Sequence, residues 1–251
     1  MFHNFFLFNK SLHEMDQSKK LINTLNAHSF NLAYKDEEFR DALKNSDVLL
    51  PDGISVVLAT HILNENKLTK IAGEDLFYHE MKRLNKQGGK CFFLGSTDKT
   101  LSLICDRAKT EFPELQIHYY SPPFKAQFSD EDNILMIKAI NEVEPDVLFI
   151  GMTAPKQEKW AYKHFEKLNV GHICCIGAVF DFYAGTVKRA PKWMITIGFE
   201  WMYRLIREPK RLWRRYLFGN VQFVIYIIKE KFSSKKKNTK TFNPVVNSEQ
   251  N

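Results

Sequence analysis

The sequence predicts an α/β fold, a parallel sheet with helices on both faces, followed by a basic helical appendage. Short apolar runs alternate with segments of helical periodicity along most of the chain. The runs are almost continuously apolar, which is typical of parallel strands buried on both faces. Several runs end in a glycine-containing turn, and ligands of open α/β sheets bind where the strands end.

Five apolar runs are predicted as buried strands, and residues 21–25 are a candidate for a further strand. The five runs are DVLL at 47–50, CFFL at 91–94, IHYY at 117–120, DVLFI at 146–150 and HICCI at 172–176. Helical periodicity covers residues 36–46, 54–64, 74–87, 98–111, 130–143 and 156–168. This alternation of strand and helix predicts one parallel sheet.

Length and composition exclude several classes of protein. The 251 residues suit one domain with an appendage. With 44% hydrophobic and 26% charged residues, the chain is not wholly disordered, collagen-like or a coiled coil. Its four cysteines have neither the density of a disulfide scaffold nor the spacing of a zinc site. We therefore expect a reducing compartment.

The apolar segments are too short to cross a membrane. The longest, residues 221–228, falls far below the about 20 residues that a span needs. The apolar start at residues 1–8 lacks the basic segment of a signal peptide. The sequence therefore predicts a cytoplasmic protein.

The charge is unevenly distributed along the chain. Residues 188–237 carry fourteen Lys and Arg against three Glu, a net charge of +11, whereas the whole chain has +7. The part before residue 188 is therefore acidic, and the basic part predicts an anionic partner: phosphate, nucleic acid or a membrane surface. We expect an α/β domain at 1–195, a basic membrane-associating appendage at 196–232 and a disordered tail at 233–251.

The appendage combines arginines with aromatic side chains. Pro209 is expected to end one helix and begin the next. On an ideal helix Arg211 lies about 20° and Arg214 about 80° from Arg204, so the three share one side. This pattern suits a helix lying on anionic lipid. It equally suits a helical hairpin packed on the body with a solvated basic rim, and composition leaves both open.

Polar groups at the predicted strand ends are the candidates for chemistry. Asp52 follows the run DVLL and could be a general base if burial raised its pKa, although its position alone favours a helix N-cap. Gln157 lies in a helix start after residues 146–150 and could bind a sugar or a base, or belong to an ordinary connection. Residues 177–189 hold aromatics between two glycines, and such aromatics are more often core.

Taken together and in order, several blocks resemble the WecG/TagA/CpsF family of bacterial glycosyltransferases over roughly residues 20–230. The blocks are residues 24–28 (TLNAH), 51–54 (PDGI), 72–77 (AGEDLF), 92–95 (FFLG), 154–158 (APKQE), 177–178 (GA), 184–185 (AG), 189–191 (RAP) and 200–204 (EWMYR) with Glu208-Pro209. The blocks PKQE, RAP and EWxxR are specific at their mutual spacings.

The resemblance implies a Rossmann-like fold and a metal-independent, inverting transfer from a UDP-sugar to a polyprenyl-diphosphate-linked sugar. The best-studied donors of the family are UDP-N-acetylmannosamine and its uronic acid, and the acceptors carry N-acetylglucosamine on undecaprenyl diphosphate. Products feed wall teichoic acid, enterobacterial common antigen, capsule or exopolysaccharide. The resemblance also implies an appendage that helps membrane association at the inner face of the plasma membrane, and association of chains into homo-oligomers. No metal or other cofactor is expected.

Matching positions imply the roles of individual residues. Asp52 would be the general base. The expected substrate-binding residues are Thr24 and Asn26 at the sugar, Gln157 at the substrate, and Arg204, Arg211 and Arg214 at the leaving diphosphate. The sequence departs from the family at Ser55, at Lys70 and in GMT at 151–153. These departures leave the donor open between N-acetylmannosamine, its uronic acid and glucose.

Three other functions are weighed against this one. A nucleic-acid-binding protein would explain the basic end, but the body is acidic and lacks the signatures of RNA- or DNA-binding modules. An oxidoreductase on a doubly wound sheet lacks the GxGxxG fingerprint. An inactive scaffold of the same family is disfavoured because Asp52 and the three arginines are retained. Binding of UDP rather than of an oligonucleotide would separate the first of these from a glycosyltransferase.

Overall fold

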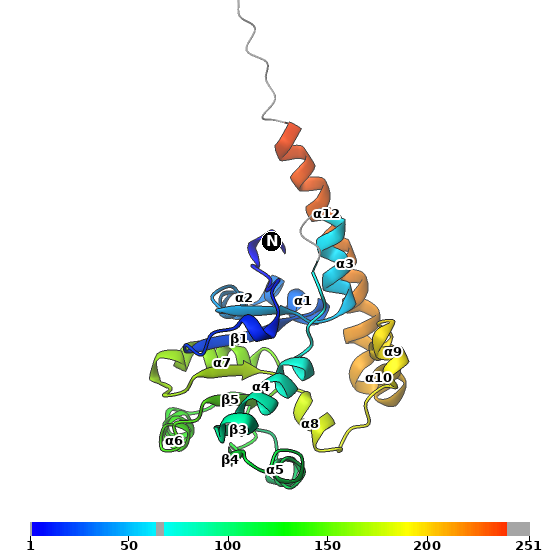
Figure 1. The fold of residues 1–251 in the computed structure, drawn as a ribbon. Helices are drawn as coiled ribbons and strands as arrows, with labels where there is room; N and C mark the ends of the chain where they lie inside the picture. Colours follow the sequence, from blue (N-terminus) through cyan, green and yellow to red (C-terminus); the bar gives the residue numbers. More distant parts are fainter. Residues whose placement is uncertain (1, 64–67, 240–251) are drawn as a thin grey trace, which may run out of the picture.

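The computed structural model describes residues 2–63 and 68–239, with side chains as far as residue 233. A six-stranded, wholly parallel sheet forms its centre, in the order β2-β1-β6-β5-β3-β4 (Figure 1). The strands are β1 (Lys20–Leu25), β2 (Val48–Pro51), β3 (Lys90–Gly95), β4 (Gln116–Tyr120), β5 (Val147–Gly151) and β6 (His172–Cys175). The predicted parallel sheet is confirmed, including the candidate strand at residues 21–25.

One strand differs from its prediction. Residues 117–120 are predicted as a buried strand, but β4 is the edge strand of the sheet and its side chains are exposed or half-buried. An edge strand pairs on one side only, so the aromatic side chains of Tyr119 and Tyr120 suit β4 through β-propensity rather than through burial.

The helices that follow the strands are confirmed at all six predicted positions. The helices of the body are α1 (Ala27–Lys35), α2 (Glu37–Lys44), α3 (Ile54–Ile62), α4 (Gly73–Gln87), α5 (Asp98–Glu111), α6 (Asp130–Asn141), α7 (Lys156–His164) and α8 (Val179–Tyr183). Helix α1 is not predicted from its periodicity. Its signal is Asn26, whose Oδ1 accepts hydrogen bonds from the backbone N–H of His28 and Ser29 and so caps the helix.

Alternate residues of each strand face opposite helical layers. In β5, Val147 and Phe149 pack in the layer of α4, α5 and α8, whereas Leu148 and Ile150 pack against α6 and α7. Helices α1 and α2 cover β1 and β2 on the side of α6 and α7. Each large apolar side chain buried in these layers contributes roughly 1.5–3 kcal/mol, so the strand ends are held by a rigid scaffold.

The appendage is a series of helices that turns back onto the body. It comprises α9 (Lys192–Thr196), α10 (Glu200–Arg207), α11 (Pro209–Trp213), the π-helical turn η4 (Arg214–Phe218) and α12 (Gly219–Thr239). Pro209 is the first residue of α11, as predicted. Helix α12 continues to Thr239, past Ser233, where the tail is predicted to begin; lysine has a good helix propensity, which the composition argument neglects. Residues 240–251 of the expected tail lie outside the described residues.

Helix α12 is docked on α1 through apolar and polar contacts. Phe223 packs at right angles to Phe30, with ring centroids 5.3 Å apart, and Tyr226 stacks on Tyr34 at 3.9 Å. Asn31 Nδ2 donates to the carbonyl of Gly219 at 2.7 Å, at the start of α12. These contacts fix the preceding arginine-rich turn relative to the carboxyl end of β1. Across the described ranges, no helix is both long and apolar enough to cross a bilayer.

Candidate active site

The candidate site lies where β1, β2, β5 and β6 end. The backbone N–H of Asp52 donates to the carbonyl of Leu25 at 2.9 Å, which carries the pairing of β1 and β2 one residue beyond the strands. On the other side of β1, the N–H of Gly177 donates to Ile150 O at 3.2 Å. The residues that follow these four strands therefore share one edge of the sheet, as the sequence predicts.

Asp52 does not cap the helix that follows it. The N-cap of α3 is Gly53, and no side chain caps the helix. Gly53 has φ +109°, a conformation that glycine adopts more readily than other residues. The interpretation of Asp52 as a helix cap is therefore wrong, and its carboxyl group is available for other contacts.

The surroundings of Asp52 favour its protonated form. Burial raises the pKa of Asp52 to about 6, against the opposing effects of the Lys70 ammonium and of a hydrogen bond from the Asn26 amide, and the Glu200 carboxylate raises it further. Among the described side chains, those of residues 2–63 and 68–233, none forms an ion pair with Asp52. A carboxyl group with this pKa can take up a proton near neutral pH, as a general base must.

Thr24 and Asn26 lie next to Asp52 along the edge of the sheet. Thr24 pairs with Leu50 in the register of β1 and β2, and both Thr24 and Asn26 are half-buried. Because Asn26 Oδ1 caps α1, only its amide NH₂ can serve the site, and that group acts as a donor toward Asp52. The structure therefore brings these three predicted site residues together.

Gln157 is held in one orientation by two neighbours. Its Oε1 accepts from the backbone N–H of Met152 at 3.2 Å, and its Nε2 donates to Glu158 Oε1 at 2.9 Å. Burial raises the pKa of Glu158 to about 7. The first bond uses a lone pair of Oε1 and the second uses one hydrogen of Nε2. Gln157 therefore keeps a second N–H that it can offer to a ligand. Gly177 lies beside this amide, because a Cβ there would be 3.6 Å from Gln157 Nε2.

The predicted arginines do not all face this edge. The Arg204 guanidinium lies 5.3 Å from the centre of the ring of Phe182, a residue of α8, and its Nε is buried without a hydrogen-bond partner. Arg211 is ion-paired with Glu208 at 2.5 Å. Burial raises the pKa of Asp181, while the charges of Arg211 and Arg204 oppose this effect, so the two arginines lie near that residue.

Arg214 differs from the other two. Its side chain is exposed and its guanidinium lies 5.2 Å from the centre of the Trp213 ring. The adjacent Arg215 is half-buried, and its Nε is buried without a hydrogen-bond partner. The structure thus places Arg204 and Arg211 near α8, turns Arg214 outward, and adds Arg215, which the sequence does not single out.

Comparison with known proteins assigns the chain to a family. The profile of the glycosyl transferase WecG/TagA/CpsF family matches residues 7–237. The chain belongs to this family. It is therefore a glycosyltransferase, and the resemblance stated from the motifs is confirmed, which disfavours the nucleic-acid-binding and oxidoreductase interpretations.

Named relatives of this glycosyltransferase share one activity in their names. A protein of Bacillus subtilis strain 168 is 33% identical over 92% of this chain and 86% of its own length. One from Bacillus spizizenii is 30% identical over 88% of this chain and 84% of its own length. One from Staphylococcus aureus strain MW2 is 26% identical over 76% of this chain and 73% of its own length. Each is named N-acetylglucosaminyldiphosphoundecaprenol N-acetyl-β-D-mannosaminyltransferase.

The structure explains why distant motif blocks of this glycosyltransferase occur together. Arg189 of the RAP block forms an ion pair with Glu74 of α4 and lies 3.4 Å from the Glu200 carboxylate of α10. This link joins the body to the appendage beside Asp52, whose pKa responds to Glu200. In the parts of the chain that the structure describes, no three His, Cys, Asp or Glu side chains come together as metal ligands would.

Sequence reasoning misses three charged groups of the site. Lys70 and Glu200 act on the pKa of Asp52, yet they lie far from it in sequence and on irregular or appended segments. Arg215 is overlooked because helical geometry is extrapolated across Pro209 and an unforeseen π-helical turn.

Proposed function

We propose that this glycosyltransferase transfers N-acetylmannosamine from UDP-N-acetylmannosamine to N-acetylglucosamine carried on undecaprenyl diphosphate. The names of relatives that align over most of their length support this donor sugar and acceptor. The observation that carries the chemistry is Asp52, an acidic group with a pKa of about 6 at the carboxyl edge of the sheet, near Glu200 and Arg215 of the appendage.

The proposed reaction is a single displacement with inversion. The acceptor hydroxyl oxygen forms a bond to C1 of the donor sugar while its proton moves to Asp52. The bond between C1 and the diphosphate oxygen breaks, and UDP leaves with the electron pair. Arg204 and Arg211 supply positive charge for this leaving group, since guanidinium groups bind diphosphate well. The resemblance implies the same role for Arg214, but its side chain is exposed and turned outward in the structure. Each such contact contributes about 1.5–3 kcal/mol.

The polar residues around Asp52 are proposed to orient the sugar. Thr24 and Asn26 line the sugar pocket, and Gln157 offers its remaining N–H to the substrate. The fixed orientation of Gln157 supports this role, because a group held by Met152 and Glu158 needs no rearrangement when a ligand binds.

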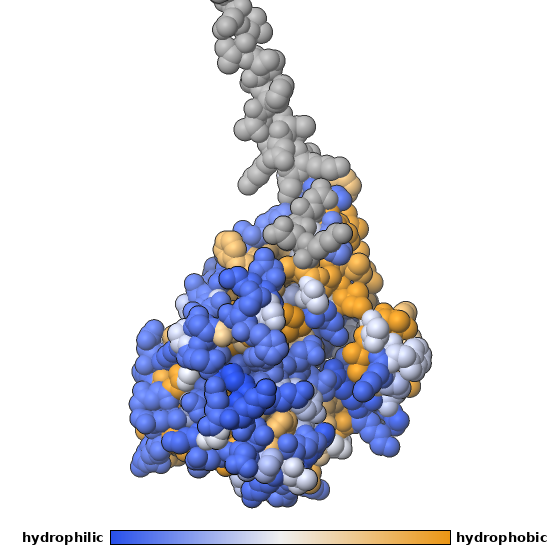
Figure 2. Space-filling view, viewed as in Figure 1, coloured by the Kyte–Doolittle hydropathy of each residue, from blue (hydrophilic) through white to orange (hydrophobic). Residues whose placement is uncertain are grey.

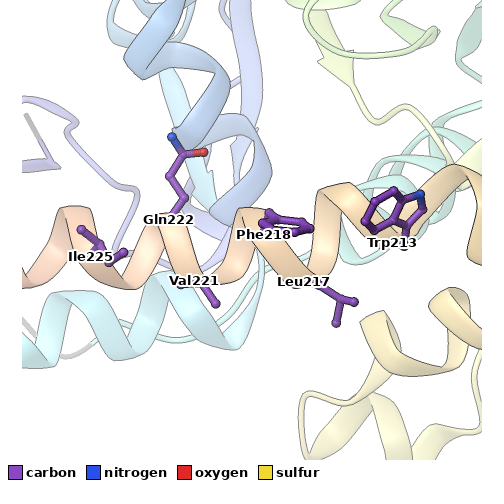
Figure 3. A pocket seen from close by; sticks show the side chains of 6 residues that line it. All are labelled: Trp213, Leu217, Phe218, Val221, Gln222 and Ile225. Atoms are coloured by element: carbon purple, nitrogen blue, oxygen red, sulfur yellow. The ribbon is translucent and has the colours of Figure 1, made fainter.

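We further propose that the protein acts at the inner face of the plasma membrane as a peripheral protein. Apolar side chains gather over α12 and α3 (Figure 2). Along η4 and α12, Trp213, Leu217, Phe218, Val221 and Ile225 are exposed. Figure 3 shows Leu217 and Val221 pointing away from Gln222, which lies on the side toward α1. An apolar helix face beside basic residues favours lipid binding and would place the site next to a lipid-linked acceptor.

The experiment is UDP release by the full chain with undecaprenyl-diphosphate N-acetylglucosamine, across UDP-sugars and with product masses determined. UDP-N-acetylmannosamine is expected to give release and a product heavier by one N-acetylhexosamine. Release only with UDP-glucose or a uronate would keep the mechanism and change the donor and the polymer, capsule or exopolysaccharide rather than teichoic acid. No release with any donor in the presence of membranes would contradict the proposal.

A further inference from the structure

Two adjacent arginines of the appendage face different surroundings. Arg214 is exposed and lies against Trp213, whereas Arg215 is half-buried with a buried Nε. Ideal helical geometry places Arg214 on the side of Arg204, but the chain is interrupted at Pro209 and then enters the π-helical turn η4. In that turn the N–H of Gly219 bonds to the carbonyl of Arg214, five residues earlier.

The π-helical turn changes which residues face the body. A turn closed over five residues holds one residue more than an α-helical turn, and such turns are frequent at functional sites. The Asn31 bond to the carbonyl of Gly219 fixes the end of this turn against α1. The turn therefore has a defined position, and the inward placement of Arg215 is a feature of the docked appendage.

The inward guanidinium groups have no carboxylate partner. In the described parts of the chain, Arg204 and Arg215 form no ion pair and no hydrogen bond. Burial lowers the pKa of Arg215, and the nearby charges of Arg204 and Arg211 lower it further, while Asp52 opposes them. Burial and the charge of Arg215 together lower the pKa of His28 to about 4.

Guanidinium groups that form no ion pair among the described side chains, such as those of Arg204 and Arg215, are suited to bind an anion. Leaving a buried charged group unpaired is costly, whereas a diphosphate would satisfy several N–H donors at once. The charges of Asp52, Arg204 and Arg211 all act on the pKa of Arg215, so Arg215 lies near the group that takes the proton and near the groups proposed to hold the leaving anion.

We propose that Arg215 binds a substrate diphosphate directly, together with Arg204 and Arg211, while Arg214 faces outward. This inference rests on the proposed function and names a binding residue that the motifs do not reveal. The donor and the lipid-linked acceptor both contain a diphosphate, so the shared chemistry is assigned here and the source is left to the experiment.

The experiment compares the full-length wild type with Arg215→Ala, Arg215→Lys and the matched control Arg207→Ala, which alters an exposed arginine of α10. Calorimetry measures the binding of UDP, uridine and inorganic diphosphate, and UDP-release kinetics give KM for the lipid acceptor. For Arg215→Ala we expect UDP and diphosphate affinity to fall about 10- to 100-fold with uridine affinity unchanged. Arg215→Lys keeps the charge but loses the bidentate geometry, so its affinity for UDP and diphosphate should lie between those of the wild type and Arg215→Ala. This variant remains informative if the alanine variant does not fold.

The outcomes distinguish the donor diphosphate from the acceptor diphosphate, and the role of Arg215 from the proposed function. Loss of UDP affinity assigns Arg215 to the donor, and a raised acceptor KM with unchanged UDP affinity assigns it to the acceptor. If both quantities match those of Arg207→Ala, the inference is overturned while the proposed function stands. A wild type that binds neither UDP nor diphosphate would instead remove the proposed function.

Discussion

Two carboxyl groups, of the fully buried Glu80 and the half-buried Asp52, lie at opposite ends of the same sheet and have opposite properties. Glu80 of α4 is fully buried near the start of β6, where its carboxylate accepts from Arg83 at 2.6 and 2.8 Å and lies 3.0 Å from His172 Nδ1. Burial would raise its pKa, but His172 and Arg83 outweigh burial and lower it. Asp52, where the strands end, has no such partner, and its pKa is raised.

The difference shows how surroundings decide what a buried acid can do. A carboxylate held by a guanidinium and an imidazole stays ionised and links elements of the fold, whereas a carboxylate without a cation partner can exchange its proton. The arginines follow the same distinction. Arg83 is occupied by Glu80, while Arg204 and Arg215 are open to an external anion.

The largest expected effect is on stability, from Glu80→Gln. Removing one partner of a buried ion pair typically costs about 3–5 kcal/mol of unfolding free energy, and we expect a loss in this range by denaturant titration. The matched control is Glu37→Gln, which breaks the exposed i,i+3 pair with Arg40 and should cost less than about 1 kcal/mol. Equal losses of unfolding free energy in the two variants would contradict the view that the Glu80 pair contributes more than an exposed ion pair.

The second effect is on turnover, from Asp52→Asn. The variant should bind UDP as the wild type does and release UDP at least about 100-fold more slowly, the typical contribution of a positioned base. Its thermal stability should be equal or higher, because a carboxylate that burial disfavours is replaced by a neutral amide. Unchanged turnover would mean that Asp52 is not the base.

A smaller effect concerns the pH dependence of stability through Glu158. Because the folded-state pKa of about 7 lies above the ordinary value of 4.5, the neutral form stabilises the fold at low pH and this contribution is lost as the pH rises toward 7. Glu158→Gln should therefore be more stable relative to wild type at pH 8 than at pH 5. Melting curves at both pH values test this, and a pH-independent difference would contradict it.

The smallest expected effect is that of a chelator. If arginines supply the positive charge for the leaving diphosphate, EDTA should leave the rate of UDP release unchanged. An absolute requirement for magnesium, restored by adding the metal back, would show that the arginines are insufficient.

Much of the fold could be predicted from the sequence because each apolar run is long enough to reveal its period. The strands at 47–50, 91–94, 146–150 and 172–176 are confirmed within a residue or two. Helix α1 is not predicted by its apolar pattern; the capping of its first turn by Asn26 is the local signal that favours it. The continuation of α12 beyond Ser233 agrees with the helix propensity of lysine, although the polar composition there predicts a tail.

The site could be predicted only in part, because sequence identifies strand ends but not the docking of distant segments. Asn26 and Asp52 directly follow strands, and Gln157 lies in the first turn of the helix after β5, so a parallel sheet brings the three to one edge. The proximity of Lys70 and Glu200 to Asp52 depends on a loop and on a docked appendage. Arg215 rather than Arg214 faces the body because of a π-helical turn, which no periodicity in the sequence predicts.

The most direct test of the account is the pH dependence of UDP release by wild type and Asp52→Asn, with saturating donor and lipid acceptor. The wild-type rate should rise with pH around a midpoint near 6, because only the ionised carboxylate accepts the proton. The residual rate of the variant should lack this step. A variant that keeps both the rate and the rise near pH 6 would contradict the role of Asp52 as the base.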